Sequence, residues 1–298
     1  ELFFPKITGF HLSKELQSGI DRIISKEIKG TPIYLSPEVY KEKEYSKASD
    51  VYAFAYVAYE IITNKRPFED LANVSQIFKE VVQNKRRPEF SENIPESYKK
   101  LIEKCWSDDP KERPTFDAIV ETLRTDLDFI TDTVNSEDYH KYIKMIDEFN
   151  ITFTPETRLK LEDITKIKME DFRKNESIQK FRFSVLNVYE TEINSISLDF
   201  EYLDLRDFEE MEIIGQGSFA KVYKIRNKRT GNEYAAKYLT KIREFSKKEY
   251  IILSREVNFI SQFNHQTIAK FIGFSPVDFE NKPNPVLIIE LSNNRSLN

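Results

Sequence analysis

A glycine-rich turn is the first feature of this sequence that could do chemistry. From Ile214 to Val222 the chain reads I-G-Q-G-S-F-A-K-V. Glycines let a backbone approach phosphate groups closely, so Gly215 and Gly217 indicate a phosphate-binding loop. The segment after them alternates in polarity and turns at Gly231, which is typical of a β-hairpin. A dinucleotide-binding enzyme would place a helix there instead, so that alternative carries little weight.

A lysine and a glutamate follow the turn in an order that suits phosphate chemistry. Lys237 ends the sequence Y-A-A-K in the next predicted strand. A lysine on a buried strand is costly unless it is paired. Glu256, in a helix predicted over 245–263, can pair with it and hold the ammonium where it meets two phosphates. Glu249 on the same helix is a rival, about 10 Å away along the axis, and only one of the two can reach Lys237.

The elements that must position these residues differ along the chain. Residues 1–125 are predicted to be helical, with a long apolar helix over 50–63 and an amphipathic one over 96–106. Apolar residues repeat the same helical spacing just beyond Pro114; they are Phe116, Ile119, Val120 and Leu123. Residues 126–207 alternate in charge and are predicted to be a linker with an amphipathic helix over 137–149.

Residues 208–298 have a different pattern of apolar residues. Short apolar runs predict strands over 211–214, 222–225, 234–239, 268–274 and 286–291, with the helix of Glu256 after the third strand. The order β-β-β-α-β-β predicts a small antiparallel sheet with one helix. The whole chain is therefore expected to belong to the α+β class.

Three motifs in the N-terminal part add to this pattern. They are G-T-P-I-Y-L-S-P-E at 30–38, S-D-V-Y-A-F around Asp50, and C-W-S-D-D-P-K-E-R-P at 105–114. With these motifs, residues 1–125 resemble the C-terminal lobe of a eukaryotic protein kinase of the tyrosine-kinase-like serine/threonine group. Residues 208–298 resemble the N-terminal, ATP-binding lobe of a second such kinase. The resemblance implies a mostly helical lobe joined by the linker 126–207 to a five-stranded antiparallel lobe with one helix.

The resemblance implies roles for the residues around the glycine turn. Lys237 would hold the α- and β-phosphates of ATP. Glu256 would orient Lys237, and the family's spacing favours Glu256 over Glu249 for this role. Ile289 would be the gatekeeper, and the backbone of the hinge 290–292 would meet adenine. Ala220 stands at the third glycine position of the family. The implied ATP-binding set is Ile214, Gly215, Gly217, Ser218, Ala220, Val222, Ala235, Lys237, Ile289, Glu290 and Ser292.

In the N-terminal part the resemblance implies structural roles. Thr31 would line the substrate pocket, and Glu38 would form a buried ion pair with Arg113. Asp50 would begin the central helix of the lobe and brace the catalytic loop. Each of these residues alone is also compatible with ordinary packing.

One position departs sharply from the family. The segment K-I-T-G-F-H, from Lys6 to His11, is similar to the one that normally contains Asp-Phe-Gly, and Gly9 stands at the place of the Mg²⁺-binding Asp. A glycine has no oxygen side chain for the metal, and Glu15 and Asp21 lie too far along the chain. The first module is therefore interpreted as a pseudokinase without metal ligands.

The family's catalytic loop, H-R-D-x-x-x-x-N, appears nowhere in the sequence. Both ends look cut, so we expect the Mg²⁺ ligands of the second module to lie outside this piece. The parent is interpreted as a tandem protein with an ATP-dependent serine/threonine kinase acting on protein partners in signalling, whereas this piece alone should be inactive. The alternative is a catalytically dead scaffold that binds partners and at most ATP.

Composition agrees with a soluble globular protein. The 298 residues are 40% apolar and 32% charged, and the net charge of −5 argues against a nucleic-acid binder. Cys105 is the only cysteine, which excludes a disulfide framework or thiolate zinc site within the chain and indicates a reducing, cytoplasmic location. No apolar run approaches the roughly 18 residues of a membrane-spanning helix.

Overall fold

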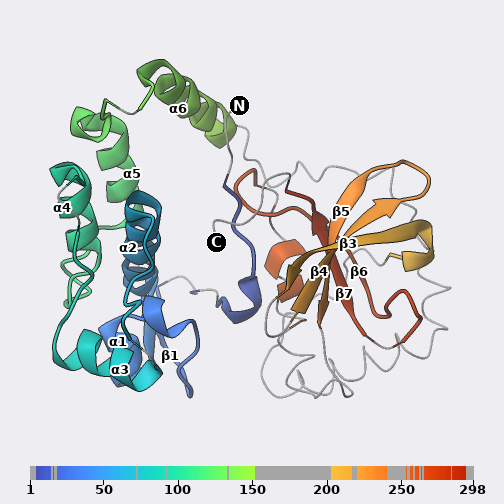
Figure 1. Ribbon diagram of the computed structural model, residues 1–298, viewed down its shortest axis with the longest axis horizontal. Coiled ribbons are helices and arrows are strands. Elements are labelled where there is room, and N and C mark those ends of the chain that lie inside the picture. Colours follow the sequence, from blue (N-terminus) through green and yellow to red (C-terminus); the bar gives the residue numbers. More distant parts are fainter. Residues whose placement is uncertain are drawn as a thin grey trace. The chain divides into compact units, whose positions relative to one another are not determined.

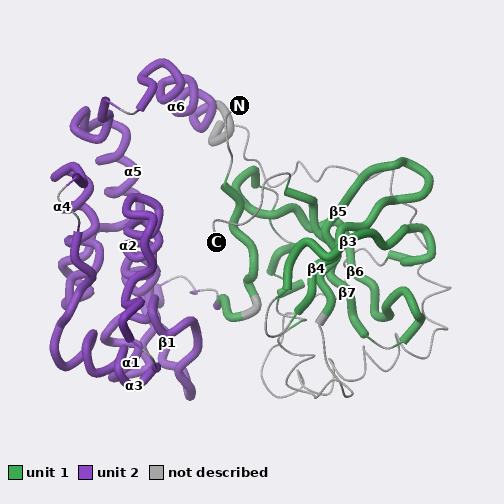
Figure 2. Tube along the Cα trace, viewed as in Figure 1, with its two compact units in different colours: residues 1–13, 151–298 green, residues 14–150 purple. Residues whose placement is uncertain are grey.

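The computed structural model describes residues 5–14, 16, 19–71, 73–90, 93–132, 134–151, 203–216, 220–239, 253, 256–257, 259–261, 263, 265–282 and 284–292. The chain divides into two compact units (Figure 2). Unit 1 combines 1–13 with 151–298, and unit 2 is 14–150. The first residues of the chain therefore cluster with the C-terminal part of the sequence.

Unit 2 is built around the long helix α2, Lys47–Thr63. Ser46 caps its first turn, because the Ser46 hydroxyl accepts from the backbone N–H of Ser49 and the Ser49 hydroxyl accepts in return from Ser46. Helix α4, Glu96–Cys105, packs beside α2 (Figure 1). The predicted helices over 50–63 and 96–106 are confirmed, and α2 begins three residues earlier than expected.

The core of unit 2 combines tyrosines of α2 with aliphatic residues, Cys105 of α4, Phe68 and Trp106, which directly follows α4. Tyr52, Tyr56 and Tyr59 of α2 recur at helical spacing and are buried, and the ring of Trp106 packs against Tyr56 and Tyr59. The opposite side of α2 is open, since Ile61 is 60% exposed. The helix is thus buried on one side, whereas its sequence suggested burial on most faces.

Helix α5, Phe116–Thr125, forms where the apolar spacing predicts it. Its Thr115 cap accepts from the N–H of Ala118. Only part of its apolar face is covered: Ile119 is 2% exposed, but Phe116 and Val120 are 42% and 48% exposed. Helix α6, Ser136–Ile151, confirms the amphipathic helix predicted over 137–149.

Several short elements of unit 2 were not predicted. Strands β1 and β2 form a two-stranded antiparallel sheet, helix α1 lies between them in sequence, and helix α3 and the π-helical turn η3 follow α2. The 3₁₀ turns η2 and η4 also belong to unit 2, whereas the turn η1 near the start of the chain belongs to unit 1. The bounds are η1 Phe10–Leu12, β1 Arg22–Ile24, η2 Pro32–Tyr34, α1 Pro37–Glu42, β2 Glu44–Ser46, α3 Val74–Phe78, η3 Lys79–Gln83 and η4 Leu127–Phe129.

Unit 1 contains the five-stranded antiparallel sheet that the sequence predicts, in the order β3-β4-β5-β7-β6 (Figure 1). A 3₁₀ turn η5, Leu205–Asp207, leads into it. The strands are β3 Phe208–Gln216, β4 Ala220–Asn227, β5 Glu233–Leu239, β6 Phe271–Ser275 and β7 Val286–Glu290.

One face of this sheet is a closed apolar layer. Ile225, Ala236 and Ile288 lie on it and are fully buried beneath side chains that precede β3. The rest of the layer consists of Leu203, Leu205, Phe208, Ile272 and Val286. The described residues of the predicted helix between 253 and 261 are helical, and Leu253, Val257 and Ile260 are buried. Among the described residues, no helix is long and apolar enough to cross a membrane.

Candidate functional site

Lys237 and Glu256 form an ion pair in unit 1. The Nζ atom of Lys237, on β5, lies 2.7 Å from Oε1 of Glu256, which comes from the helical residues after the sheet's third strand. The Glu256 side chain is 3% exposed and that of Lys237 is 21% exposed. A carboxylate so deeply buried needs a partner, and Lys237 supplies it while keeping part of its side chain accessible. Glu249 lies outside the described residues.

The strand register gathers further predicted residues on the side of the sheet that carries Lys237. Val222 on β4 is the Cα partner of Lys237, and Gly215 on β3 is the partner of Val222. Ala235, two residues before Lys237, is paired with Ile289 on β7. Because side chains alternate between faces and paired residues share a face, these five residues lie on one face, opposite the closed apolar layer. A Cβ added at Gly215 would lie 3.6 Å from Val222, which is ordinary van der Waals contact, so Gly215 and Val222 are direct neighbours on this face.

The other predicted ATP-binding residues are distributed more widely. Ala220 begins β4, Ile214 is 44% exposed on β3, and Ser292 is exposed just after β7. Gly217 and Ser218 lie outside the described residues.

Glu290 has a specific role that the sequence did not suggest. One of its carboxylate oxygens accepts from Nζ of Lys6 and from the backbone N–H of Lys270, at 2.6 Å in both cases. Its own backbone N–H donates to the carbonyl of Lys270 at 2.9 Å. The carboxylate therefore ties the end of β7 to the first residues of the chain.

Gly9 directly precedes the turn η1 and lies in the left-handed region, with a φ of 83°. A Cβ added there would meet nothing within 4 Å, so the space for a side chain exists. The described residues contain no group of three or more His, Cys, Asp or Glu that could hold a metal ion. At position 9 itself, glycine offers no side-chain oxygen to Mg²⁺.

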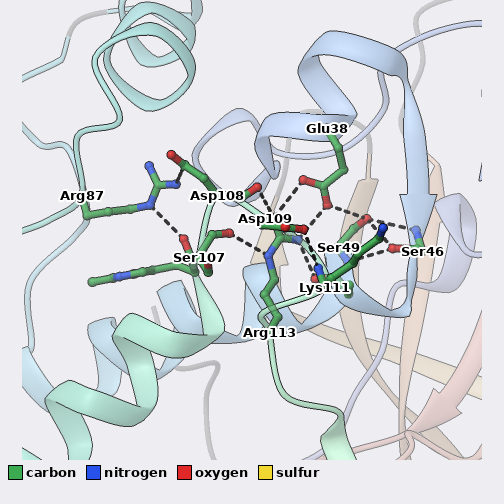
Figure 3. A network of polar contacts seen from close by, with 11 residues as sticks. Glu38, Ser46, Ser49, Arg87, Ser107, Asp108, Asp109, Lys111 and Arg113 are labelled. Atoms are coloured by element: carbon green, nitrogen blue, oxygen red, sulfur yellow. Dashed lines mark hydrogen bonds and ion pairs between the residues drawn. The ribbon is translucent and has the colours of Figure 1, made fainter.

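In unit 2, Glu38 and Arg113 form a buried, bidentate ion pair (Figure 3). The Nη atoms of Arg113 donate to the two carboxylate oxygens of Glu38 at 2.7 and 2.9 Å. The Arg113 side chain is fully buried, and that of Glu38 is 9% exposed. Glu38 lies in the first turn of α1, and Arg113 lies in the loop between α4 and α5.

Further polar contacts surround this pair. Arg113 also donates to the carbonyls of Ser107 and Ala48, both at 2.9 Å, and its guanidinium lies 4.9 Å from the ring centre of Tyr52. The Ser49 hydroxyl donates to Glu38 at 3.3 Å. The remaining N–H of Arg113 has only a longer contact, from Nη2 to the carbonyl of Asp108 at 3.5 Å. This set of hydrogen bonds offsets the desolvation of the two charges. Figure 3 shows these groups converging on Arg113 from α1, α2 and the loop before α5.

The pKa of Glu38 reflects the balance of these effects. Burial alone would raise the pKa of this carboxyl, but the hydrogen bonds and the charge of Arg113 outweigh burial and hold the pKa below its ordinary value of 4.5. Asp50 behaves differently: it lies in the first turn of α2, and desolvation raises its pKa above 3.8. Thr31 is exposed and precedes the turn η2.

Two parts of the structure have no counterpart in the sequence-based site. The first is Arg87, which donates to the carbonyl of Trp106 at 3.1 Å and stacks over Tyr52 at 5.3 Å. The second is the contact of Lys6 and Phe10 with the C-terminal sheet unit. Neither carries a local sequence signal, because each depends on residues that come together only in the folded chain.

Two family models match separate parts of the chain, and both describe protein kinases. The family "Protein tyrosine and serine/threonine kinase" matches residues 3–123, and "Protein kinase domain" matches residues 208–298. The helical unit and the five-stranded sheet with its helix are accordingly an α+β, protein-kinase-like fold.

Curated relatives of this chain include several kinases of Dictyostelium discoideum. The dual specificity protein kinase shkC is 35% identical over 137 residues, which are 46% of this chain and 27% of that kinase. The probable serine/threonine-protein kinase drkC is 36% identical over 123 residues, 41% of this chain and 16% of that protein. The dual specificity protein kinase shkE is 32% identical over 131 residues, 44% of this chain and 18% of that kinase.

The chain thus spans less than a third of the length of each of these relatives. The two matches nevertheless lie on the two segments whose motifs and geometry are described above, and the relatives are all kinases. The matched parts of the chain belong to the eukaryotic protein kinase superfamily.

Proposed function

We propose that residues 208–298 bind ATP and belong to a serine/threonine protein kinase that transfers the γ-phosphate of ATP to protein substrates. The observation that carries this proposal is the Lys237–Glu256 ion pair at 2.7 Å, on the sheet face that also carries Gly215, Val222 and Ala235. A lysine fixed by a glutamate is pre-positioned for two phosphate groups, and small side chains beside it leave room for a flat base.

The names of the relatives support the broad activity. They are serine/threonine and dual specificity protein kinases, so the class of amino acid that this kinase would phosphorylate is part of the proposal. Threonine and proline in the segment 30–38, and the C-W…R-P pattern at 105–114, favour the tyrosine-kinase-like serine/threonine group.

We propose further that the parent protein is a tandem of two modules, 1–125 and 208–298, joined by a linker over 126–207. The first module would be a pseudokinase. Gly9 supports this reading, because its backbone has the geometry of a turn residue but offers no carboxylate to Mg²⁺. Thr31, Asp50, Glu38 and Arg113 would then serve as a peptide-binding and structural framework. Any Mg²⁺ ligands of the second module would lie outside this sequence.

A non-enzymatic scaffold is the second candidate, favoured by the same Gly9. Both candidates fit a reducing, cytoplasmic setting, because Cys105 is a free and buried thiol. The catalytic loop of the parent decides between them: a parent that lacks its Asp is a scaffold.

Nucleotide binding by the 298-residue chain tests the proposal. We expect a fluorescent ATP analogue to bind, and Lys237→Met to weaken its affinity at least tenfold, because the cation facing the phosphates is lost. Lys221→Met is the matched control. Lys221 is paired with Tyr238 and lies on the opposite face of the same sheet. The affinity of Lys221→Met for the ATP analogue should therefore stay within twofold of that of the wild type. Equal affinities of the wild type and Lys237→Met would refute ATP binding at this face.

A further inference from the structure

The residues that lead into the motif at 30–38 are held along strand β2. In the two-stranded sheet, Ile23 of β1 is paired with Tyr45 of β2. The N–H of Ser25 donates to the carbonyl of Lys43 at 2.9 Å, which continues the pairing just beyond β1. The ammonium group of Lys43 also donates to the carbonyl of Lys26, at 3.0 Å. The backbone of this segment is therefore fixed against β2.

The hydroxyl group of Tyr45 binds both backbone groups of a single residue. It accepts from the N–H of Lys29 at 2.6 Å and donates to the carbonyl of Lys29 at 2.8 Å. A tyrosine hydroxyl can donate and accept at once, so it supplies the two hydrogen bonds that a neighbouring strand would otherwise supply. Tyr45 thus fixes the chain beyond the point where the ladder of β1 and β2 ends.

Lys29 is the point at which this segment passes into the motif at 30–38. Gly30 follows it with a φ of 124°, which side chains rarely adopt. Two residues later, the carbonyl of Pro32 accepts from the hydroxyl of Tyr40 at 2.7 Å. Burial raises the pKa of Tyr40 to about 12, so this hydroxyl stays protonated and remains a donor. A tyrosine hydroxyl therefore holds the chain on each side of Gly30.

The outer side of the same segment is open. Ile20, Ile24 and Ile28 recur every four residues and are 45%, 71% and 43% exposed. These three side chains add little burial, so they contribute little to the order of the segment. Its conformation depends chiefly on the polar contacts of its backbone, and Tyr45 makes two of them.

We propose that Tyr45 is a positioning residue that holds residues 20–30, and with them the entry to the motif at 30–38, in one conformation without any phosphate group. The contacts that carry this proposal are made by backbone groups and unmodified side chains of unit 2. The helical unit therefore presents the motif as a permanent surface, which no modification has to switch on. That this surface receives a peptide rests on the proposed function, whereas the clamp by Tyr45 does not.

Limited proteolysis of the 298-residue chain with trypsin tests the clamp. Trypsin cleaves after lysine and arginine, so the bond after Lys29 reports directly on the residue that Tyr45 holds. Because cleavage requires local opening of the backbone, we expect Tyr45→Phe to speed cleavage after Lys29 at least tenfold. The phenylalanine keeps the ring and removes only the hydroxyl. Peptide mass spectrometry follows the rate, and cleavage at the wild-type rate in Tyr45→Phe would overturn the proposal.

Tyr139→Phe is the matched control. The hydroxyl of Tyr139, in α6 of the same unit, also donates to a backbone carbonyl, that of Leu123 at 2.7 Å. This variant loses the same chemical group at a place outside the clamp, so cleavage after Lys29 should stay within twofold of the wild type. Equal acceleration in the two variants would mean that unit 2 loosens as a whole, and the clamp would be refuted.

Dephosphorylation tests the independence from phosphate. The wild-type chain is made in bacteria, treated with phosphatase and shown by intact mass to carry no phosphate. We expect it to be cleaved after Lys29 within twofold of the rate of the same chain made in eukaryotic cells. Cleavage more than twofold faster in the phosphate-free chain would show that a phosphate orders the segment, and this part of the proposal would fall.

The clamp and the proposed ATP site can fail separately, because Tyr45 and Lys237 lie in different units. If Lys237→Met leaves nucleotide affinity unchanged but Tyr45→Phe exposes the bond after Lys29, the ATP proposal fails and the clamp stands. If Lys237→Met weakens nucleotide binding but Tyr45→Phe behaves like Tyr139→Phe, the clamp alone fails.

Discussion

The guanidinium of Arg113 donates hydrogen bonds to both carboxylate oxygens of Glu38, 75 positions earlier in the sequence. This pair connects α1, which follows the motif G-T-P-I-Y-L-S-P, to the loop between α4 and α5. Since both side chains are buried and fully hydrogen-bonded, either one left alone would be a buried charge without a partner.

Replacing one partner of the pair should therefore destabilise unit 2 strongly. We expect Arg113→Ala to lower the free energy of unfolding by about 3–5 kcal/mol, measured by urea denaturation followed with the fluorescence of Trp106. Arg22→Ala is the control, because Arg22 forms an ion pair with Glu44 but its side chain is 67% exposed. That surface pair should contribute about 0–1 kcal/mol. A similar loss in both variants would contradict the burial of the Glu38–Arg113 pair.

The pair also makes the stability of unit 2 depend on pH. The pKa of Glu38 in the folded chain lies below 4.5, so the folded state binds fewer protons than the unfolded state in this range. The stabilisation is fully present above pH 4.5 and is lost as the pH falls through the lower, folded pKa. The stability difference between the wild type and Glu38→Gln should accordingly shrink as the pH is lowered from 6 to 3, in urea titrations at each pH. A difference that stays constant over this range would be incompatible with the depressed pKa.

Gly30 should resist substitution for a backbone reason. Its φ of 124° is one that side chains rarely adopt, and a Cβ there would lie 2.7 Å from Cδ2 of Leu35. Gly30→Ala should cost about 1–3 kcal/mol of stability. Gly19→Ala is a milder comparison, because Gly19 has a φ of 81° and open space around it, so the cost should be about 1 kcal/mol. Thermal unfolding of both variants measures the difference, and a larger loss at Gly19 would show that the contact with Leu35 is unimportant.

Neighbouring apolar residues on α5 should differ in their effect on stability. Ile119 is 2% exposed and Val120 is 48% exposed, although the sequence pattern placed both on the buried face. We expect Ile119→Ala to cost about 2–5 kcal/mol, because it opens a cavity in the core. Val120→Ala should change stability by about 0.5 kcal/mol or less. Equal losses in the two variants would mean that a further surface covers Val120 in solution.

The 298-residue chain should show no phosphoryl transfer, whatever its affinity for ATP. The sequence H-R-D-x-x-x-x-N, which supplies the catalytic Asp in protein kinases, does not occur in it. Incubation with γ-labelled ATP and a generic protein substrate should give no label above the level without protein. Transfer that is lost in Lys237→Met would show that another acid takes the place of the missing Asp.

The sequence predicts those elements whose signals are local. The five strands of unit 1 and helices α2, α4, α5 and α6 all appear where apolar spacing places them. Strands β1 and β2 were missed because a three-residue strand is too short to show alternation. The pairing of Lys237 with Glu256 follows the order of motifs along the chain, but the register that places Gly215 and Ile289 on the same face required the folded sheet.

Contacts between distant residues that belong to no motif were the least predictable, unlike the Glu38–Arg113 pair that the kinase resemblance implies. Nothing near Lys6 indicates that Glu290 will be its partner, and nothing near Glu290 shows that its side chain will bind the first residues of the chain. The burial of Ile119 but not Val120 depends in the same way on which neighbours α5 meets. Such outcomes follow from tertiary packing, which spacing along a single helix or strand does not encode.

The contact of the first residues with the sheet unit, through Lys6 and Glu290 and a backbone bridge between Ile7 and Ile268, also bears on the order in which the protein is made and folded. During synthesis, residues 6–10 leave the ribosome before unit 2, whereas the sheet that they contact is complete only with the last residues. Joining Lys6 to Glu290 through an unstructured chain of 284 residues would cost about 5 kcal/mol of closure entropy, and a folded unit 2 in between shortens the free loop. Synthesis from the N-terminus therefore favours a folding order in which the helical unit forms first and residues 6–10 pair with the sheet unit last.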